Sequence, residues 1–181
     1  AGETGHVSII VEQMYAPHQI PWTIQGTFEY IHEVSSKSSF PAYVAIDTGH
    51  QTGQREFLRP SLHEIQGWLT GEGPVPYLGP DSAYQIYEET FHSEMESCED
   101  VIDRIFKEIN SYPQLFAEEE DCNLYAWLDN LGCYSPIIHL QQTNGQSSSH
   151  LPFTSANNEK GIVHPRKVLQ SIAHSYERPP Q

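Results

Sequence analysis

The sequence predicts an α/β fold in which parallel strands form a sheet and helices pack outside it. Short runs of β-branched and aliphatic residues alternate along the chain with longer segments of helical periodicity. This alternation is typical of a parallel sheet, because two parallel strands need a crossover between them that is usually a helix. Two architectures fit the order, an open doubly wound sheet and a (β/α)8 barrel.

Three segments are expected to be buried strands. Residues 7–11 (VSIIV), 42–47 (AYVAID) and 135–140 (SPIIHL) are largely apolar along their length. Continuous apolar runs of this kind are typical of parallel strands that are covered on both faces. Their spacing along the chain leaves room for helical crossovers.

Helices are expected between and after these strands. Residues 24–34 carry apolar side chains on one helical face, and Thr23 before them is a residue type that caps helix N-termini. Residues 123–131 and 165–174 show the same periodicity, and the second of these segments begins with Pro165, which suits the first turn of a helix.

A long region separates the second expected strand from the third. The first two strands end 35 residues apart, close to the roughly 31 residues of one unit in a barrel of ordinary size, whereas the third ends 92 residues after the second. We therefore expect an insertion over about residues 55–121, with an acidic helix near 98–109. The acidic run 118–121 is expected to be a solvated surface.

The composition argues against several classes of partner. The 181 residues include 9 basic and 24 acidic side chains, for a net charge of −15. Such a chain repels phosphate backbones and anionic bilayers, so we expect no nucleic-acid and no membrane partner. We expect no signal peptide. Three cysteines, an odd count without a CxxC pair, indicate a reducing compartment and predict a cytoplasmic protein.

Each expected strand ends at a side chain that can bind a metal ion. Glu12, Asp47 and His139 hold these positions. In parallel α/β proteins the carboxyl edge of the sheet is where chemistry takes place. Each residue alone has a simpler explanation as a helix cap, a surface charge or a hydrogen-bonded side chain. Together, two carboxylates and one imidazole favour a divalent metal ion of the Mn, Co or Mg type over a thiolate zinc site.

The segments around these residues resemble the xylose isomerase-like TIM barrels, a superfamily of sugar isomerases, ketose 3-epimerases and abasic-site nucleases of the endonuclease IV type. The resemblance lies in residues 11–14 and 21–23, in 47–51 and in 138–145. The string 139–150 is most similar to the branch that acts on tetrulose phosphates. The resemblance covers nearly the whole chain outside the expected insertion.

The resemblance implies that residues 1–181 are the C-terminal part of such a barrel, with strands equivalent to the fifth, sixth and seventh. It also implies that Glu12 binds the metal and moves a proton, that Asp47 and His139 are metal ligands, and that His50 contacts the substrate. The family has a further ligand, a Glu on the eighth strand that serves as the opposing acid or base. We expect that strand to lie beyond this chain, and the isolated chain to be inactive.

The implied activity is C3 epimerisation of a tetrulose phosphate through a metal-bound enediolate, and aldose–ketose isomerisation needs only a different proton route. Thr143, Ser148 and His150 lie in a loop after the third strand, where barrels often bind phosphate, and we expect them to bind the substrate. A flexible polar loop is the alternative. The expected partner is a small sugar phosphate.

Two other interpretations stay open. The chain is a non-catalytic fragment in the first, and the open sheet edges of a half-barrel would then favour self-association into a homo-oligomer. In the second it is a relative of the abasic-site endonucleases. That class needs more His and Glu ligands and a basic face, which nine basic residues do not provide.

Overall fold

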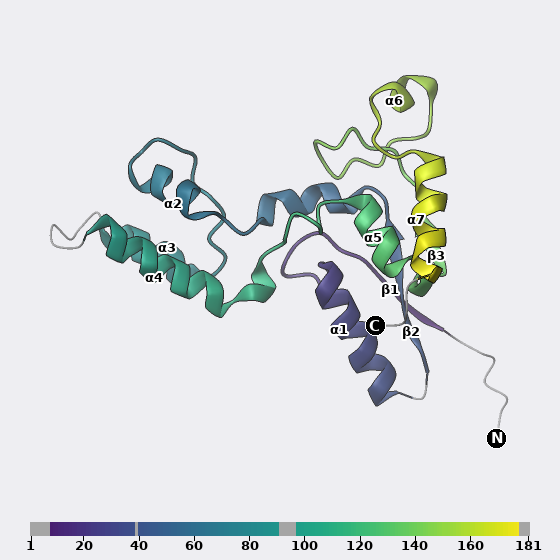
Figure 1. Cartoon of the computed structure of the whole chain (residues 1–181), viewed down its shortest axis with the longest axis horizontal. Coiled ribbons are helices and arrows are strands. Elements are labelled where there is room, and N and C mark those ends of the chain that lie inside the picture. Colours follow the sequence, from purple (N-terminus) through teal and green to yellow (C-terminus); the bar gives the residue numbers. More distant parts are fainter. Residues whose placement is uncertain (1–7, 39, 91–96, 178–181) are drawn as a thin grey trace. The chain divides into compact units, whose positions relative to one another are not determined.

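The computed structural model describes residues 8–38, 40–90 and 97–177 and has a mixed α/β fold (Figure 1). The described residues divide into two units. The first, here called the sheet unit, comprises Ala1–Arg55 and Glu119–Gln181, and the second, here called the helical unit, comprises Glu56–Glu118. Each unit has its own apolar core.

The sheet unit is built on three parallel strands, β1 (Ile9–Glu12), β2 (Ala42–Asp47) and β3 (Ile137–His139), in the spatial order β1-β2-β3. This parallel sheet confirms the expected α/β class, whereas its place in a barrel stays a prediction. The register pairs Glu12 with Ala45 and Asp47 with His139. The three strands therefore end at the same edge of the sheet.

Only the central strand is buried as the sequence predicts. Five of the six residues of β2 are buried, whereas Ile9 in β1 is 57% exposed and Ile137 in β3 is 47% exposed. The expectation that all three strands are covered on both faces is wrong for β1 and β3. Each of them pairs with β2 alone in the described sheet, so the apolar composition of an edge strand does not ensure its burial.

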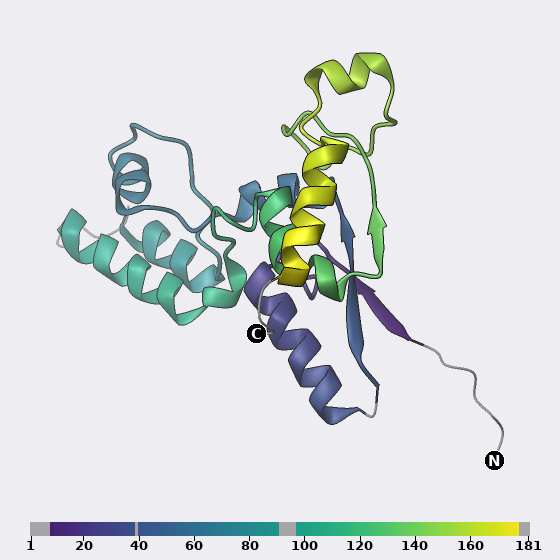
Figure 2. The same ribbon diagram turned by 45° about the vertical axis from the view of Figure 1, so that its right-hand side comes forward.

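Helices α1 (Ile24–Lys37), α5 (Leu124–Leu131) and α7 (Pro165–Glu177) lie on one face of the sheet (Figure 2). The expected helices at these places are confirmed, and α1 begins at the cap that the sequence predicts, since the Thr23 side chain accepts a hydrogen bond from Gly26 N. A shorter helix, α6 (Ser155–Lys160), precedes α7. The core under these helices includes Val44, Ile46, Trp127, Leu128 and Leu131.

The helical unit consists mainly of α2 (Leu62–Leu69), α3 (Asp81–Thr90) and α4 (Cys98–Ser111). The sequence pattern predicts α4 but not α2 or α3. A signal for α2 is nevertheless present, because Ser61 and Glu64 form a capping box. The hydrogen bonds from the Ser61 side chain and backbone hold the pKa of Glu64 below its usual value. The insertion of residues 55–121 into a barrel stays a prediction.

Asp121 departs from the solvated surface predicted for the acidic run. Glu118, Glu119 and Glu120 are exposed, but Asp121 is buried. Its Oδ1 accepts a hydrogen bond from Ile24 N at 2.7 Å, at the first turn of α1. Backbone N–H groups at a helix N-terminus have no partner within the helix and favour a negative charge. Asp121 is therefore part of the N-terminal cap of α1. The residues next to it in the sequence do not indicate this role, because the N–H group that it accepts from is 97 residues away.

The three cysteines are free thiols, and Cys98 is exposed while the other two are half-buried. Burial raises the pKa of the Cys122 thiol to about 11, although the nearby Arg55 has the opposite effect. This thiol is therefore protonated at neutral pH, and it is a poor nucleophile or metal ligand. Within the described residues, every helix is too short or too polar to cross a bilayer.

We expect Asp121→Ala to lower the free energy of unfolding of the sheet unit by about 1–2 kcal/mol, because the buried N–H of Ile24 loses its acceptor. Asp121→Asn keeps an oxygen acceptor and should recover most of this loss. Urea denaturation followed by circular dichroism measures both values. Glu119→Ala, at an exposed position, is the control and should stay within about 0.5 kcal/mol of the unsubstituted chain. An Asp121→Ala chain as stable as the unsubstituted one would contradict the capping role.

Candidate metal centre

Three side chains that can bind a metal meet where the parallel strands end. One ligand-capable atom each from Glu12, Asp47 and His139 lies within 4.8 Å of the other two. We call this set the Glu12 group. The register explains the convergence, because Asp47 and His139 are paired neighbours and Glu12 ends the strand on the other side of β2. The structure thus brings together the three residues that the sequence singles out, and their role as ligands stays a prediction.

The three side chains of the Glu12 group point toward one another, and their nitrogen and oxygen atoms lie less than 4 Å from His139 Nδ1. His139 Nδ1 lies 3.2 Å from Glu12 Oε1 and 3.8 Å from Asp47 Oδ2. The Asp47 side chain is 1% exposed, whereas those of Glu12 and His139 are 46% and 45% exposed. An ion at this point would therefore have one buried, fixed ligand and two ligands open to solvent and substrate.

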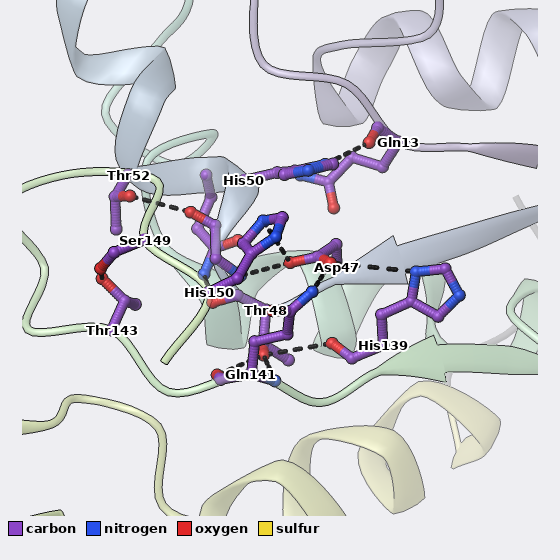
Figure 3. Close-up of polar contacts among 12 residues, drawn as sticks. Gln13, Asp47, Thr48, His50, Thr52, His139, Gln141, Thr143, Ser149 and His150 are labelled. Atoms are coloured by element: carbon purple, nitrogen blue, oxygen red, sulfur yellow. Dashed lines mark hydrogen bonds and ion pairs between the residues drawn. The ribbon is translucent and has the colours of Figure 1, made fainter. Parts of the chain in front are cut away.

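Asp47 is held in place by hydrogen bonds to both of its carboxylate oxygens. Oδ1 accepts from Gly49 N and Oδ2 accepts from Gln141 Nε2, each at 2.8 Å (Figure 3). Gln141 is in turn fixed by Thr48, whose Oγ1 accepts from Gln141 N and donates to Gln141 O, both at 2.8 Å. Hydrogen bonds of this kind orient ligand carboxylates in metal sites. Sequence reasoning assigned no role to Gln141 or Thr48, although both follow strand ends and lie in the segments that carry the resemblance.

A second set of metal-capable side chains shares Asp47 with the first. One ligand-capable atom each from Asp47, His50 and His150 lies within 4.8 Å of the other two. We call this set the His50 group. His50 is buried at the start of the 3-10 helix η1 (His50–Phe57), and His150 is exposed on the loop after β3. The predicted substrate contacts of both histidines stay predictions, and Figure 3 shows both rings beside Asp47.

The loop after β3 is shaped by Thr143. Its buried hydroxyl donates to the Ser147 carbonyl oxygen at 2.9 Å and accepts from Gly145 N at 3.1 Å. Gly145 has a φ of +78°, a conformation that favours glycine, so the turn depends on it. Ser148 lies half-buried on the same loop. The structure does not place Thr143 or Ser148 in either metal-capable group, and their predicted contacts with substrate stay predictions.

The donor chemistry of the Glu12 group fits a hard or borderline divalent ion. Two carboxylates and one imidazole suit Mn²⁺, Co²⁺ or Mg²⁺, and neither metal-capable group of the described residues includes a thiolate. The charge of one divalent ion balances the two carboxylates. The position of the group at the carboxyl edge of a parallel sheet is also where α/β proteins bind their ligands.

Comparison with known proteins gives one partial similarity. No family model matches the sequence. A segment of 57 residues is 39% identical to D-erythrulose 1-phosphate 3-epimerase of Brucella abortus (strain 2308). The match covers 32% of this chain and 18% of the relative, so it spans less than a fifth of the relative's length. This partial match supports a link to sugar-phosphate epimerases and no finer assignment.

Proposed function

We propose that the chain supplies the cation-binding part of a sugar-phosphate isomerase or epimerase, and that the reaction is C3 epimerisation of a tetrulose phosphate. The observation that carries the proposal is the convergence of Glu12, Asp47 and His139 at the ends of three adjacent parallel strands. The name of the Brucella relative, an epimerase of D-erythrulose 1-phosphate, supports the substrate class.

The residues of the Glu12 group suit proton removal next to a carbonyl. A hydrogen on C3 of a ketose is weakly acidic, and its removal builds negative charge on the C2 oxygen. A divalent ion held by Glu12, Asp47 and His139 would supply Lewis-acid stabilisation of that charge. Asp47 is buried and both of its oxygens accept hydrogen bonds, so it holds its position. Glu12 is exposed at the strand end, and we assign it the removal of the C3 proton.

Inversion at C3 needs a second acid or base on the opposite face of the substrate. Within the described residues, Glu12 is the one exposed carboxylate in the two metal-capable groups. We therefore propose that this chain alone removes and returns the C3 proton on one face, with little or no net epimerisation. Isomerisation would use the same enediolate with a different proton route, and it is the alternative within the same reaction class.

The phosphate of the substrate is assigned to the loop that contains Thr143 and Ser148. The Thr143 hydroxyl already donates to Ser147, and the N–H groups of Gly145 and Ser149 also have acceptors within the loop. We therefore propose the Ser148 hydroxyl and the backbone N–H groups of Ser147 and Ser148 as the donors for the anion. Local donors of this kind are needed because the chain has a net charge of −15.

The open sheet favours a second candidate, a non-catalytic chain that associates with itself. Ile9 and Ile137 are exposed on the two strands that each pair with β2 alone in the described sheet, and Leu140 is exposed just after β3. Unpaired strand edges and exposed apolar side chains are the features through which sheets associate.

Mn²⁺ is expected to raise the melting temperature of the chain, because an ion that binds only the folded state stabilises it. His139→Ala should weaken Mn²⁺ binding by at least about tenfold, since it removes one ligand of the Glu12 group. Differential scanning fluorimetry across Mn²⁺ concentrations measures both effects. His164→Ala, at an exposed histidine of the same unit outside both groups, is the control. An unchanged Mn²⁺ response in His139→Ala would remove His139 from the centre.

The proposed reaction predicts exchange of the C3 hydrogen of D-erythrulose 1-phosphate with solvent. In D₂O with Mn²⁺, the chain should introduce deuterium at C3, and Glu12→Gln should reduce the rate by at least about a hundredfold. Proton NMR of the sugar follows the exchange. Inversion at C3 is followed by optical rotation, because C3 is the single stereocentre of a tetrulose 1-phosphate and its two configurations give identical NMR spectra. A chain that binds Mn²⁺ and the sugar but leaves the C3 hydrogen in place contradicts the proposed role of Glu12.

Self-association through the sheet edges predicts a concentration-dependent mass. Light scattering after size exclusion should give dimers or larger species at high protein concentration, and Ile137→Lys should shift them toward monomers, because an edge lysine opposes strand pairing. Lys in place of the exposed Leu169 on α7 is the matched control and should leave the mass unchanged. A monomer at all concentrations would reject this candidate and leave the enzymatic one unaffected.

A further inference from the structure

Arg55, near the end of η1, is hydrogen-bonded to the loop that follows β3. Its Nη1 donates to the Gly145 carbonyl oxygen at 2.8 Å, at the turn that Thr143 and Gly145 form. A guanidinium has five N–H donors in a rigid, planar fork and is charged at every physiological pH. One bond to a neutral carbonyl therefore orients the group and leaves its charge and its other donors available to a ligand.

Within the described residues, Arg55 has no carboxylate within ion-pair distance. Lys37, Arg59 and Arg104 each lie within 3.3 Å of a glutamate oxygen, which neutralises much of their charge. Arg55 is exposed and donates to a carbonyl instead. The fork of an arginine matches pairs of carboxylate or phosphate oxygens. An exposed guanidinium that is anchored but not neutralised suits an anionic ligand.

The charges around Arg55 show that an anion at this place depends on it. Burial raises the pKa of the nearby Cys122 thiol to about 11, and among the neighbouring charges Arg55 lowers that pKa whereas Asp121 and Glu119 raise it. Arg55 is thus a positive group in an acidic region. An anion that approached this region without contact to the guanidinium would be repelled, because like charges at short range oppose binding.

The 3-10 helix η1 connects the strand ends with the turn of the loop. At its start, a Cβ on Gly49 would lie 3.2 Å from the Ser149 carbonyl oxygen, so the loop lies against the end of β2. At its other end, Arg55 binds the loop at Gly145. The five residues from His50 to Arg55 rise by about 10 Å in a 3-10 helix. This span is comparable to the length of an extended tetrulose phosphate.

We propose that Arg55 binds the phosphate group of the substrate, with the Ser148 hydroxyl and the N–H groups of Ser147 and Ser148 as neutral donors beside it. The inference rests on the proposed function and names the residue that makes the Glu12 group select a phosphorylated sugar over the free ketose. The Gly145 carbonyl orients the guanidinium, and charge-assisted hydrogen bonds to phosphate oxygens provide the selectivity. Arg55 is therefore a specificity-determining residue.

Titration with two sugars tests this assignment without a catalytic step. Isothermal titration calorimetry in the presence of Mn²⁺ compares D-erythrulose 1-phosphate with D-erythrulose. Arg55→Gln should weaken binding of the phosphate ester at least about tenfold, because it removes a charged hydrogen-bond donor, and should leave binding of D-erythrulose unchanged. Arg55→Lys keeps the charge without the fork and should fall between Arg55→Gln and the unsubstituted chain. Circular dichroism confirms that each variant is folded.

Lys37→Gln is the matched control, since it removes the same charge from the same unit. Lys37 ends α1 shortly before β2 begins, so it lies at the opposite edge of the sheet from the strand ends. It should leave the affinity for the phosphate ester unchanged. An affinity of Arg55→Gln equal to that of the unsubstituted chain would overturn the inference. Equal losses for both sugars would do so too, because they indicate a structural role in the loop, and so would an unsubstituted chain that does not bind the ester.

Hydrogen exchange at C3 separates this inference from the proposed function. In Arg55→Gln, KM for D-erythrulose 1-phosphate should rise at least about tenfold with kcat within about twofold, because the phosphate contact is the same before and during proton removal. Exchange of D-erythrulose should be unaffected. A chain that binds the ester through Arg55 but leaves the C3 hydrogen in place contradicts the proposed reaction and supports the phosphate site. Exchange in Arg55→Gln with an unchanged KM for the ester supports the reaction and overturns the phosphate site.

Discussion

The arrangement of the whole site depends on one buried carboxylate, Asp47. Burial of a charge costs free energy unless hydrogen bonds and opposite charge compensate it. The hydrogen bonds are present, from Gly49 N and Gln141 Nε2, but both donors are neutral. Among the described residues, the groups that can bring positive charge to Asp47 are histidines, each 3.8 Å away. A carboxylate in this position therefore favours a cation beside it.

The central strand makes this position possible. β2 is the strand with a partner on each side, and its residues are almost entirely buried, so Asp47 at its end is fixed by the sheet and the core beneath it. Glu12 and His139 end the edge strands and stay exposed. A buried, fixed carboxylate in the middle with two exposed side chains beside it would suit the proposed centre, which must bind an ion and also admit a substrate.

Sequence patterns predicted the elements whose signals are local. The Thr23 cap, the apolar face of α1 and the strand that ends at Asp47 each follow from neighbouring residues, and so does the meeting of strand ends at one edge, once the sheet is parallel. The exposure of Ile9 and Ile137 could not be predicted, because burial depends on which strand is central. Asp121 is 97 residues away from the N–H group that it caps, so no local pattern reveals that contact.

The position of His150 shows that the surroundings of an individual site residue are harder to predict than the sheet edge at which the site lies. In the sequence it belongs to a polar loop that suits an anion, yet its ring lies beside a carboxylate that would repel one. The fold of the loop decides this, through the turn at Gly145 and the hydrogen bonds of Thr143, which return the chain to the end of β2. A phosphate on this loop would therefore contact backbone N–H groups and the Ser148 hydroxyl rather than the His150 ring.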